Sequence, residues 1–202
     1  MGRPREPWKR ERLLDAAMKT VRERGIGSLT VKEVASTAGV STATVHYHFE
    51  DLDGLLYGVF ERATDEMYTL RLAAIDAETD IQRKLNTLIE LGVPDRLTPS
   101  VSMLYDAIAV LREQPRFRDT TKAYVERQVG LYRAVIDAGL HAGLFRPGGS
   151  SDAIARNLLA LEDAYCLYIT IGILKDGVAA RANMREYVRT ALDRPRTESE
   201  GS

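Results

Sequence analysis

Two short helices joined by a tight turn are the strongest constraint that this sequence places on its fold. Thr30 is followed three residues later by Glu33, which is the capping-box pattern of a helix start. Gly39 ends that helix, because glycine readily takes the left-handed conformation after a helix, and Ser41 supplies the next N-cap two residues later. A tight, glycine-containing turn between two short helices predicts a helix-turn-helix.

Helical periodicity continues along the rest of the chain, and no segment alternates apolar and polar residues over the length of a strand. Glycine and proline fall between the periodic segments, as expected of connections. The pattern predicts an all-α protein with a three-helix N-terminal head and a larger C-terminal helical domain. The expected helices cover about 9–24, 31–38, 42–48, 52–74, 81–92, 99–113, 118–142, a segment from a cap at Ser151 or Asp152 to Leu174, and 179–192.

Charge is divided unevenly along the chain. Residues 1–50 carry nine Lys and Arg against six acids, whereas residues 51–202 carry 19 against 23, within a net charge of −1. A basic head on an acidic body indicates a polyanionic partner at one end. We expect a flexible basic arm (1–8), a helix-turn-helix DNA-binding domain (9–50), a larger helical domain (51–193) and a disordered polar tail (194–202).

Several classes of protein are excluded by what the sequence lacks. The longest uncharged apolar stretch, residues 164–174, has 11 residues, whereas a membrane-spanning helix needs about 20. No apolar signal region follows the basic start, so we expect a cytoplasmic protein with no membrane partner. The chain holds no dinucleotide-binding or P-loop glycine motif, zinc-protease motif or nucleophile elbow, so we expect neither an enzyme nor a cofactor.

A metal site is also not expected. His46 and His48 are two residues apart, which places them about 200° apart around a helix, so one helix cannot bring both to one ion.

The segment from about residue 9 to residue 60 resembles the DNA-binding domain of the TetR family of bacterial transcriptional regulators. The resemblance rests on Thr30-Val31-Lys32-Glu33-Val34-Ala35, Ala38-Gly39-Val40-Ser41, Thr44-Val45-His46-Tyr47-His48-Phe49 and Leu55-Leu56. It implies a nine-helix homodimer joined through its last two helices, with a pocket for a small-molecule effector in the larger domain. It also implies a repressor that binds a palindromic operator and is released by that ligand.

Two positions depart from the family's pattern. The family usually has a Lys that meets a phosphate at the start of the fourth helix, where this chain has Leu52 beside Glu50, Asp51 and Asp53. The family also often has Tyr where this chain has His46. The missing Lys supports an alternative, in which the protein is a helical ligand-binding or scaffold protein with a degenerate, non-functional DNA-binding head.

The second helix of the motif has the residue types that suit double-stranded DNA. A helix N-terminus offers free N–H groups to a phosphate, and Ser41, Thr42 and Thr44 add short hydroxyls. By elimination, Thr42, Ala43, His46 and Lys32 are left to read bases, although Lys32 also suits a phosphate. The expected DNA-binding residues are Arg3, Arg5, Thr30, Lys32, Ser41, Thr42, Ala43, Thr44, His46, Tyr47 and His48.

An alternative role is open for part of this set. A threonine-rich cap with aromatic residues also packs one helix onto the next, as we expect of Val45 and Phe49. Arg3 and Arg5 in a flexible arm suit a narrow A·T-rich minor groove, or they add only non-specific attraction.

The larger domain offers tyrosines and a few polar groups for an effector. Tyrosine provides a large apolar wall with one polar tip. Glu162 lies within an apolar helical run, so a buried Glu162 needs a cationic or hydrogen-bonding partner. The alternative is that these helices form only core or dimer interface. The expected ligand-binding residues are Tyr105, Tyr124, Gln128, Tyr132, Glu162, Tyr165 and Cys166.

Overall fold

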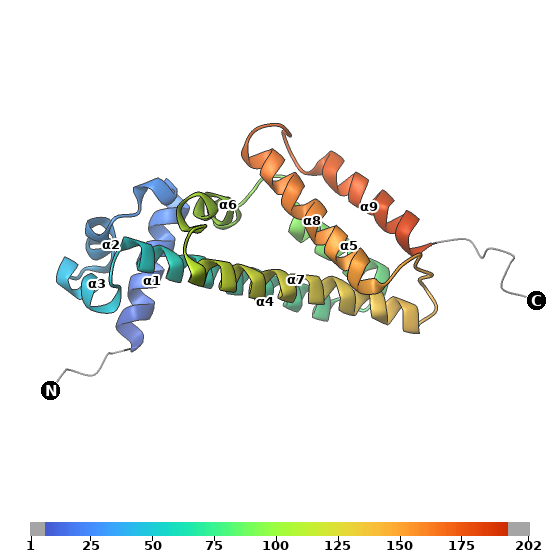
Figure 1. Ribbon diagram of the computed structural model, residues 1–202, viewed down its shortest axis with the longest axis horizontal. Coiled ribbons are helices and arrows are strands. Elements are labelled where there is room, and N and C mark those ends of the chain that lie inside the picture. The colour runs from blue at the N-terminus through green and yellow to red at the C-terminus, as the bar shows by residue number, and fades with distance from the viewer. Residues whose placement is uncertain (1–6, 194–202) are drawn as a thin grey trace, which may run out of the picture. The chain divides into compact units, whose positions relative to one another are not determined.

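The computed structural model describes residues 7–193, which fold into helices and short connections (Figure 1). Nine α-helices and no strand are present in this range, apart from an isolated bridge between Arg146 and Asp193. The all-α prediction is therefore confirmed. The helices are α1 (Pro7–Arg24), α2 (Val31–Ala38), α3 (Thr42–His48), α4 (Leu52–Ala77), α5 (Ile81–Gly92), α6 (Pro99–Leu111), α7 (Pro115–His141), α8 (Ser151–Thr170) and α9 (Val178–Leu192), with a 3₁₀ turn, η1, at Ile26–Ser28.

Two compact units make up the chain, and each is assembled from separate stretches of sequence. The first unit holds the residues up to Glu66 together with Thr98–Thr121, and the second holds Met67–Leu97 and the residues from Lys122 onward. Helices α4 and α7 therefore contribute residues to both units. The functional boundary expected at residue 50 remains a prediction and differs from this division. Arg3, Arg5 and the expected tail 194–202 lie outside the described residues.

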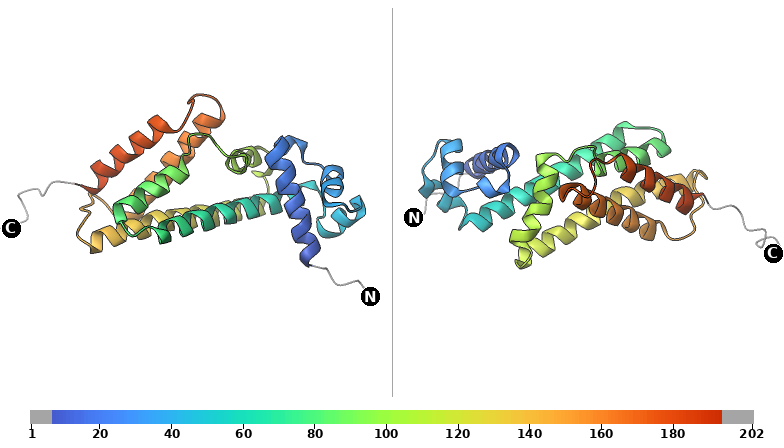
Figure 2. Two further views of the ribbon diagram at one scale, coloured as in Figure 1. Left: turned by 180° about the vertical axis from the view of Figure 1, so that it is seen from behind. Right: turned by 90° about the horizontal axis from the view of Figure 1, so that it is seen from above.

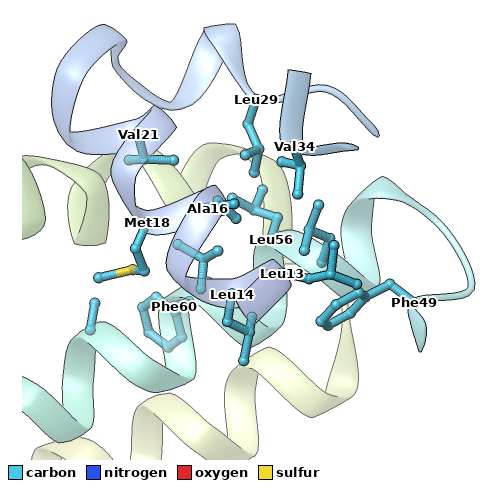
Figure 3. Close-up of a cluster of buried hydrophobic side chains, with 14 of the residues drawn as sticks. Leu13, Leu14, Ala16, Met18, Val21, Leu29, Val34, Phe49, Leu56 and Phe60 are labelled. Atoms are coloured by element: carbon cyan, nitrogen blue, oxygen red, sulfur yellow. The ribbon is translucent and has the colours of Figure 1, made fainter. Parts of the chain in front are cut away.

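The first unit closes around an apolar core that α1 dominates. Figure 3 shows Leu13 and Met18 of α1 gathered with Leu56 and Phe60 of α4. All are buried, and burying a side chain of this size stabilises a fold by roughly 1.5–3 kcal/mol. Helices α6 and α7 complete this core: the ring of Phe117 lies 4.6 Å from that of Phe60, and Met103 and Ala107 belong to the same cluster.

In the second unit, α5, α8 and α9 pack with the parts of α4 and α7 that belong to it. Figure 2 shows α9 alongside α8, and α9 also contacts α5. Leu88 of α5, Leu158 of α8 and Met184 of α9 are completely buried, as the amphipathic pattern of these helices predicts. No described helix combines the length and apolar character that crossing a bilayer requires.

The predicted helix starts are set by side-chain caps. Thr30 accepts a hydrogen bond from the Glu33 amide at 3.1 Å, and Thr98 does the same for Val101 at 3.3 Å. The capping box at Thr30 is only half formed, because the Glu33 carboxylate receives the Arg24 guanidinium at 2.5 Å. The Thr30 cap is therefore as predicted, whereas the Glu33 carboxylate links α2 to the end of α1.

Several helix ends differ from the predicted ones by a few residues, and three of the differences have a clear cause. Helix α7 begins at Pro115 and not at Arg118, because proline lacks only an N–H that the first helical turn leaves unpaired. The cap of α8 is Ser150, whose hydroxyl accepts from the Ala153 amide at 3.2 Å. That helix stops at Thr170, just before Gly172, which has a φ of 77°. The apolar run to Leu174 therefore continues past the helix.

Candidate nucleic-acid interface and effector site

The turn before α3 is built by two residues with different roles. Gly39 has a φ of 66° and a ψ of 40°, a left-handed conformation that glycine adopts without steric cost. The Ser41 hydroxyl then accepts from the Thr44 amide at 3.2 Å and lies 3.0 Å from the Thr44 hydroxyl. The start of α3 is thus fixed by hydrogen bonds between Ser41 and Thr44. The peptide N–H groups of a first helical turn that no cap occupies are free to meet a phosphate.

The exposed face of α3 carries most of the side chains that the sequence predicts to bind DNA. Val45 and Phe49 are buried and hold the helix on the core, so their expected packing role is confirmed. Tyr47 keeps 49% of its surface exposed, and its ring lies edge-on to that of His48. The exposed members of the expected set within the described range are Thr30, Lys32, Ser41, Thr42, Ala43, His46 and Tyr47, while Thr44 and His48 are half-buried.

Positive side chains lie on the α1 side of this face, where Lys9 and Arg12 line a small hollow together with Thr44. The Arg24 guanidinium is paired with Glu33, as described above, and Arg22 is paired with Glu66 at 2.6 Å. Lys32 is exposed and has no ion pair within residues 7–193. Leu52 opens α4 with 38% of its surface exposed. The cations near this surface therefore include Lys9, Arg12 and Lys32, whereas carboxylates follow α3.

The ends of α3 and α4 show no metal chemistry. Asp51 is occupied as the cap of α4, because its carboxylate accepts from the Gly54 amide at 2.7 Å. Among the described residues, no group of three or more His, Cys, Asp or Glu side chains is arranged to hold a metal ion.

The expected effector residues do not all lie in one unit. Tyr105 lies on α6 in the first unit, whereas the other six lie on α7 and α8 in the second. In the second unit, Tyr124, Gln128 and Tyr132 recur every four residues, which places them on one face of α7. Tyr165 accepts from the Asn183 side chain at 3.3 Å, and the Cys166 thiol donates to the Gly92 carbonyl at 3.2 Å.

Glu162 is buried and has the cationic partner that its position requires. The Arg71 guanidinium donates through Nη1 to Oε2 at 2.9 Å and through Nη2 to Oε1 at 2.8 Å. Nη2 also reaches the Leu88 carbonyl at 3.3 Å, and the Tyr132 hydroxyl donates to Oε1. The sequence pattern pointed to Glu162 and Tyr132 but not to Arg71. The matching signal was an arginine within the apolar stretch Leu70-Arg71-Leu72-Ala73-Ala74-Ile75.

Burial controls the protonation of this cluster. It raises the pKa of the Tyr132 phenol well above its usual value, and the nearby Glu162 carboxylate raises it further. Burial likewise raises the pKa of Tyr124, whose hydroxyl donates to Met67 Sδ at 2.9 Å. Both tyrosines therefore stay protonated donors, and the Glu162 carboxylate accepts three hydrogen bonds.

Among the described residues, three buried side-chain polar atoms of α4 and α7 have no hydrogen-bond partner. They are Nε of Arg71 and both amide atoms, Nε2 and Oε1, of Gln128. Gln128 has no exposed surface, and Arg71 has 1%. A buried polar group without a partner costs roughly 1–3 kcal/mol, so native structures contain few of them.

A separate groove lies between α4, α5 and α7 in the second unit. Its volume is about 570 Å³, which is within the range of small-molecule sites. The groove is lined by Tyr68, Leu72, Ile75, Asp76, Ile81, Lys84, Arg127, Gly130, Leu131, Ala134, Val135 and Ala138. None of the residues expected to bind a ligand lines it.

Comparisons with known proteins connect this geometry to a family. Residues 13–57 match the family described as bacterial regulatory proteins, tetR family. The HTH-type transcriptional regulator BetI of Rhizobium meliloti (strain 1021) is 25% identical over 193 residues, which cover 93% of this chain and 91% of BetI. The HTH-type transcriptional repressor KstR2 of Rhodococcus jostii (strain RHA1) is 24% identical over 140 residues, 68% of each chain.

A solved structure shows the same fold over nearly the whole chain. A transcriptional regulator from Saccharomonospora viridis, crystallised in complex with choline, superposes with a TM-score of 0.80 at 23% identity. The match covers 94% of this chain and 100% of that one.

Proposed function

The chain belongs to the TetR family of bacterial regulatory proteins and is a DNA-binding transcriptional regulator, and from this premise we propose that it is a homodimeric repressor released from a palindromic operator by a small molecule. The observation that carries the proposal is α3, a capped helix on a buried core with its polar residues facing outward. A helix presented in this way fits the major groove of B-DNA.

We assign different tasks to the residues of this face. Ser41, Thr44, Tyr47, Thr30 and His48 contact the DNA backbone and position the helix. A second group reads base edges, and it consists of Thr42, Ala43, His46 and Lys32. Arg3 and Arg5 reach the adjacent minor groove. Phosphate contacts fix the register, while sequence is read only through the base edges.

A second copy of the chain supplies the rest of the specificity. A helix of seven residues reads few bases, so two copies about 34–36 Å apart, or a multiple of that distance, are needed on a two-fold operator. The proposed interface is formed by α8 and α9. Its apolar surface near the end of α8 supports this assignment, since Leu167, Tyr168, Ile171, Ile173 and Val178 are all exposed in the single chain.

The effector acts in the second unit, in this proposal, around Tyr124, Gln128, Tyr132 and Glu162. A ligand changes DNA binding only if it has different affinities for the binding and non-binding conformations. The effector therefore favours the conformation in which the two α3 helices no longer match successive major grooves.

A salt titration on the DNA upstream of the protein's own gene tests the proposal. A saturable gel shift with affinity that falls steeply as salt rises is expected of the repressor. Light scattering of the free protein is expected to give a dimer, and Ile171→Glu is expected to give a monomer with weaker DNA binding. Leu144→Glu places the same charge on an exposed leucine outside α8 and α9 as a control.

The degenerate-head alternative predicts a different result. The acidic surroundings of Leu52 are the observation in its favour. A dimer that produces no specific shift anywhere in the upstream region would support a ligand-binding or scaffold protein and contradict the repressor.

A further inference from the structure

In the polar cluster of the second unit the two opposite charges are paired, but some buried donor and acceptor atoms have no hydrogen-bond partner. Arg71 and Glu162 cancel each other's charge through two parallel hydrogen bonds. The Tyr132 hydroxyl is used in a third bond to the same carboxylate. What remains without partners is one N–H of Arg71 and a whole carboxamide, that of Gln128.

These unused atoms lie close to the ion pair. Gln128 precedes Tyr132 by four residues on α7, so the two side chains share a face one helical turn apart. The Arg71 guanidinium lies 5.3 Å from the centre of the Tyr132 ring. Tyr124, one turn before Gln128, donates its hydroxyl to Met67 Sδ, and Met67 lies one turn before Arg71 on α4, so this face of α7 packs against the Arg71 face of α4.

We propose that the Gln128 carboxamide, together with Arg71 Nε, is the polar recognition point for the effector, and that the effector group bound there is uncharged. The group must offer both an acceptor and a donor, as a carboxamide or a lactam does, because Gln128 lacks a partner for Nε2 and for Oε1. This inference rests on the proposed response of the regulator to a small molecule.

The exclusion of charged groups follows from the pairing of Arg71 with Glu162. A cation would find the carboxylate already neutralised, and an anion would find the guanidinium already neutralised. Either one would add an uncompensated charge to a buried site, which is strongly unfavourable. A neutral group with a donor and an acceptor satisfies the amide without changing the charge.

The first experiment compares three probes that share one apolar chain: hexanamide, hexanoate and hexyltrimethylammonium, with choline as a second cation. Thermal unfolding of the full-length protein is followed at pH 8 with each probe and no DNA. Hexanamide is expected to raise the melting temperature in a saturable way, and the ions at equal concentration are not. A rise with hexyltrimethylammonium or hexanoate but not with hexanamide would overturn the proposal.

The second experiment changes the amide itself. Gln128→Leu is expected to raise the melting temperature of the free protein, because it removes a buried amide without partners, and to abolish the shift with hexanamide. Gln82→Leu removes an exposed amide from α5 and is expected to leave that shift in place. If Gln128→Leu lowers the melting temperature, or if it still responds to hexanamide, the amide has another partner and the proposal is wrong.

Both experiments measure melting temperatures without DNA, so their results can be compared with a separate measurement of operator binding. If the unsubstituted protein shows no response to hexanamide but binds its operator, the proposed ligand class is refuted and the repressor is not. A hexanamide response without any operator shift keeps the site and refutes the repressor.

Discussion

Arg71 of α4 and Glu162 of α8, 91 residues apart in sequence, form a buried ion pair through two hydrogen bonds of 2.8 and 2.9 Å. The pair fits because Gly92, the last residue of α5, has no side chain. A Cβ at Gly92 would lie 1.9 Å from Glu162 Oε1. The ion pair between α4 and α8 therefore depends on the absence of a side chain at Gly92 of α5.

Breaking the pair on one side is expected to destabilise the protein strongly. Arg71→Met or Glu162→Leu leaves a buried group of the pair without its counterpart, and the expected loss is about 3–5 kcal/mol in the free energy of unfolding. The double variant Arg71→Met/Glu162→Leu is expected to lose much less than the two single losses together. Urea unfolding of the four proteins measures this coupling, and additive losses would mean that the two groups act independently.

Glycine substitutions are expected to have opposite signs at two positions. Gly92→Ala forces the Glu162 carboxylate to move and is expected to lower the free energy of unfolding by several times the helix-propensity gain. Gly130 lies within α7, and a Cβ there meets nothing within 4 Å. Gly130→Ala is therefore expected to stabilise by about 0.5–1 kcal/mol. Urea midpoints test both, and equal effects would contradict the packing described at Gly92.

Alkaline pH is expected to destabilise the protein through its buried tyrosines. Burial raises the pKa of both Tyr132 and Tyr124, so above about pH 10 the unfolded chain loses protons that the folded chain keeps. The free energy of unfolding then falls by up to about 1.4 kcal/mol per pH unit for each tyrosine. Urea unfolding between pH 9 and 11 measures the slope, which Tyr132→Phe is expected to reduce.

The first unit was predictable from sequence because its determinants are local. Caps such as Ser41 and turns such as Gly39 act on residues three or four positions away, so their patterns appear directly in the sequence. The exposure of Tyr47 and the burial of Val45 followed from the same helical periodicity.

Only part of the polar cluster could be predicted from the sequence. Glu162 stood out as an acid in an apolar run, but the partner came from another helix, and no local pattern states which helices meet. The unpaired amide of Gln128 was beyond sequence analysis for the same reason, since it depends on what α4 and α8 leave unoccupied around α7.

Restoring a cation at the start of α4 is expected to strengthen electrostatic binding to DNA. Leu52→Lys places an ammonium where the family usually has one, and each added phosphate contact steepens the plot of log affinity against log salt by about 0.9. Leu70→Lys is the matched control, since it charges another exposed leucine of α4. Equal slopes for the two variants would show that only bulk charge has changed.

Two neighbouring residues of α3 are expected to affect DNA binding differently. Tyr47→Ala is expected to weaken binding to all sequences alike, because the tyrosine is assigned to the DNA backbone. His46→Ala is expected to relax discrimination at one base pair by about 1–3 kcal/mol. Selection from a randomised operator distinguishes these effects, and an unchanged preference profile for His46→Ala would refute its role as a base reader.

The first unit is built from two separate stretches of sequence, which limits how its DNA-binding helices can be exchanged with those of related proteins. Its core needs Phe117 and Met103, which are encoded far downstream of α1–α3. A gene fragment that ends after α4 would encode a head with an exposed apolar surface beside Phe60. New DNA specificities are therefore more easily acquired by substitutions on the surface of α3 than by recombination of whole heads. The same dependence means that the core of the first unit is complete only once α6 and the start of α7 have been synthesised.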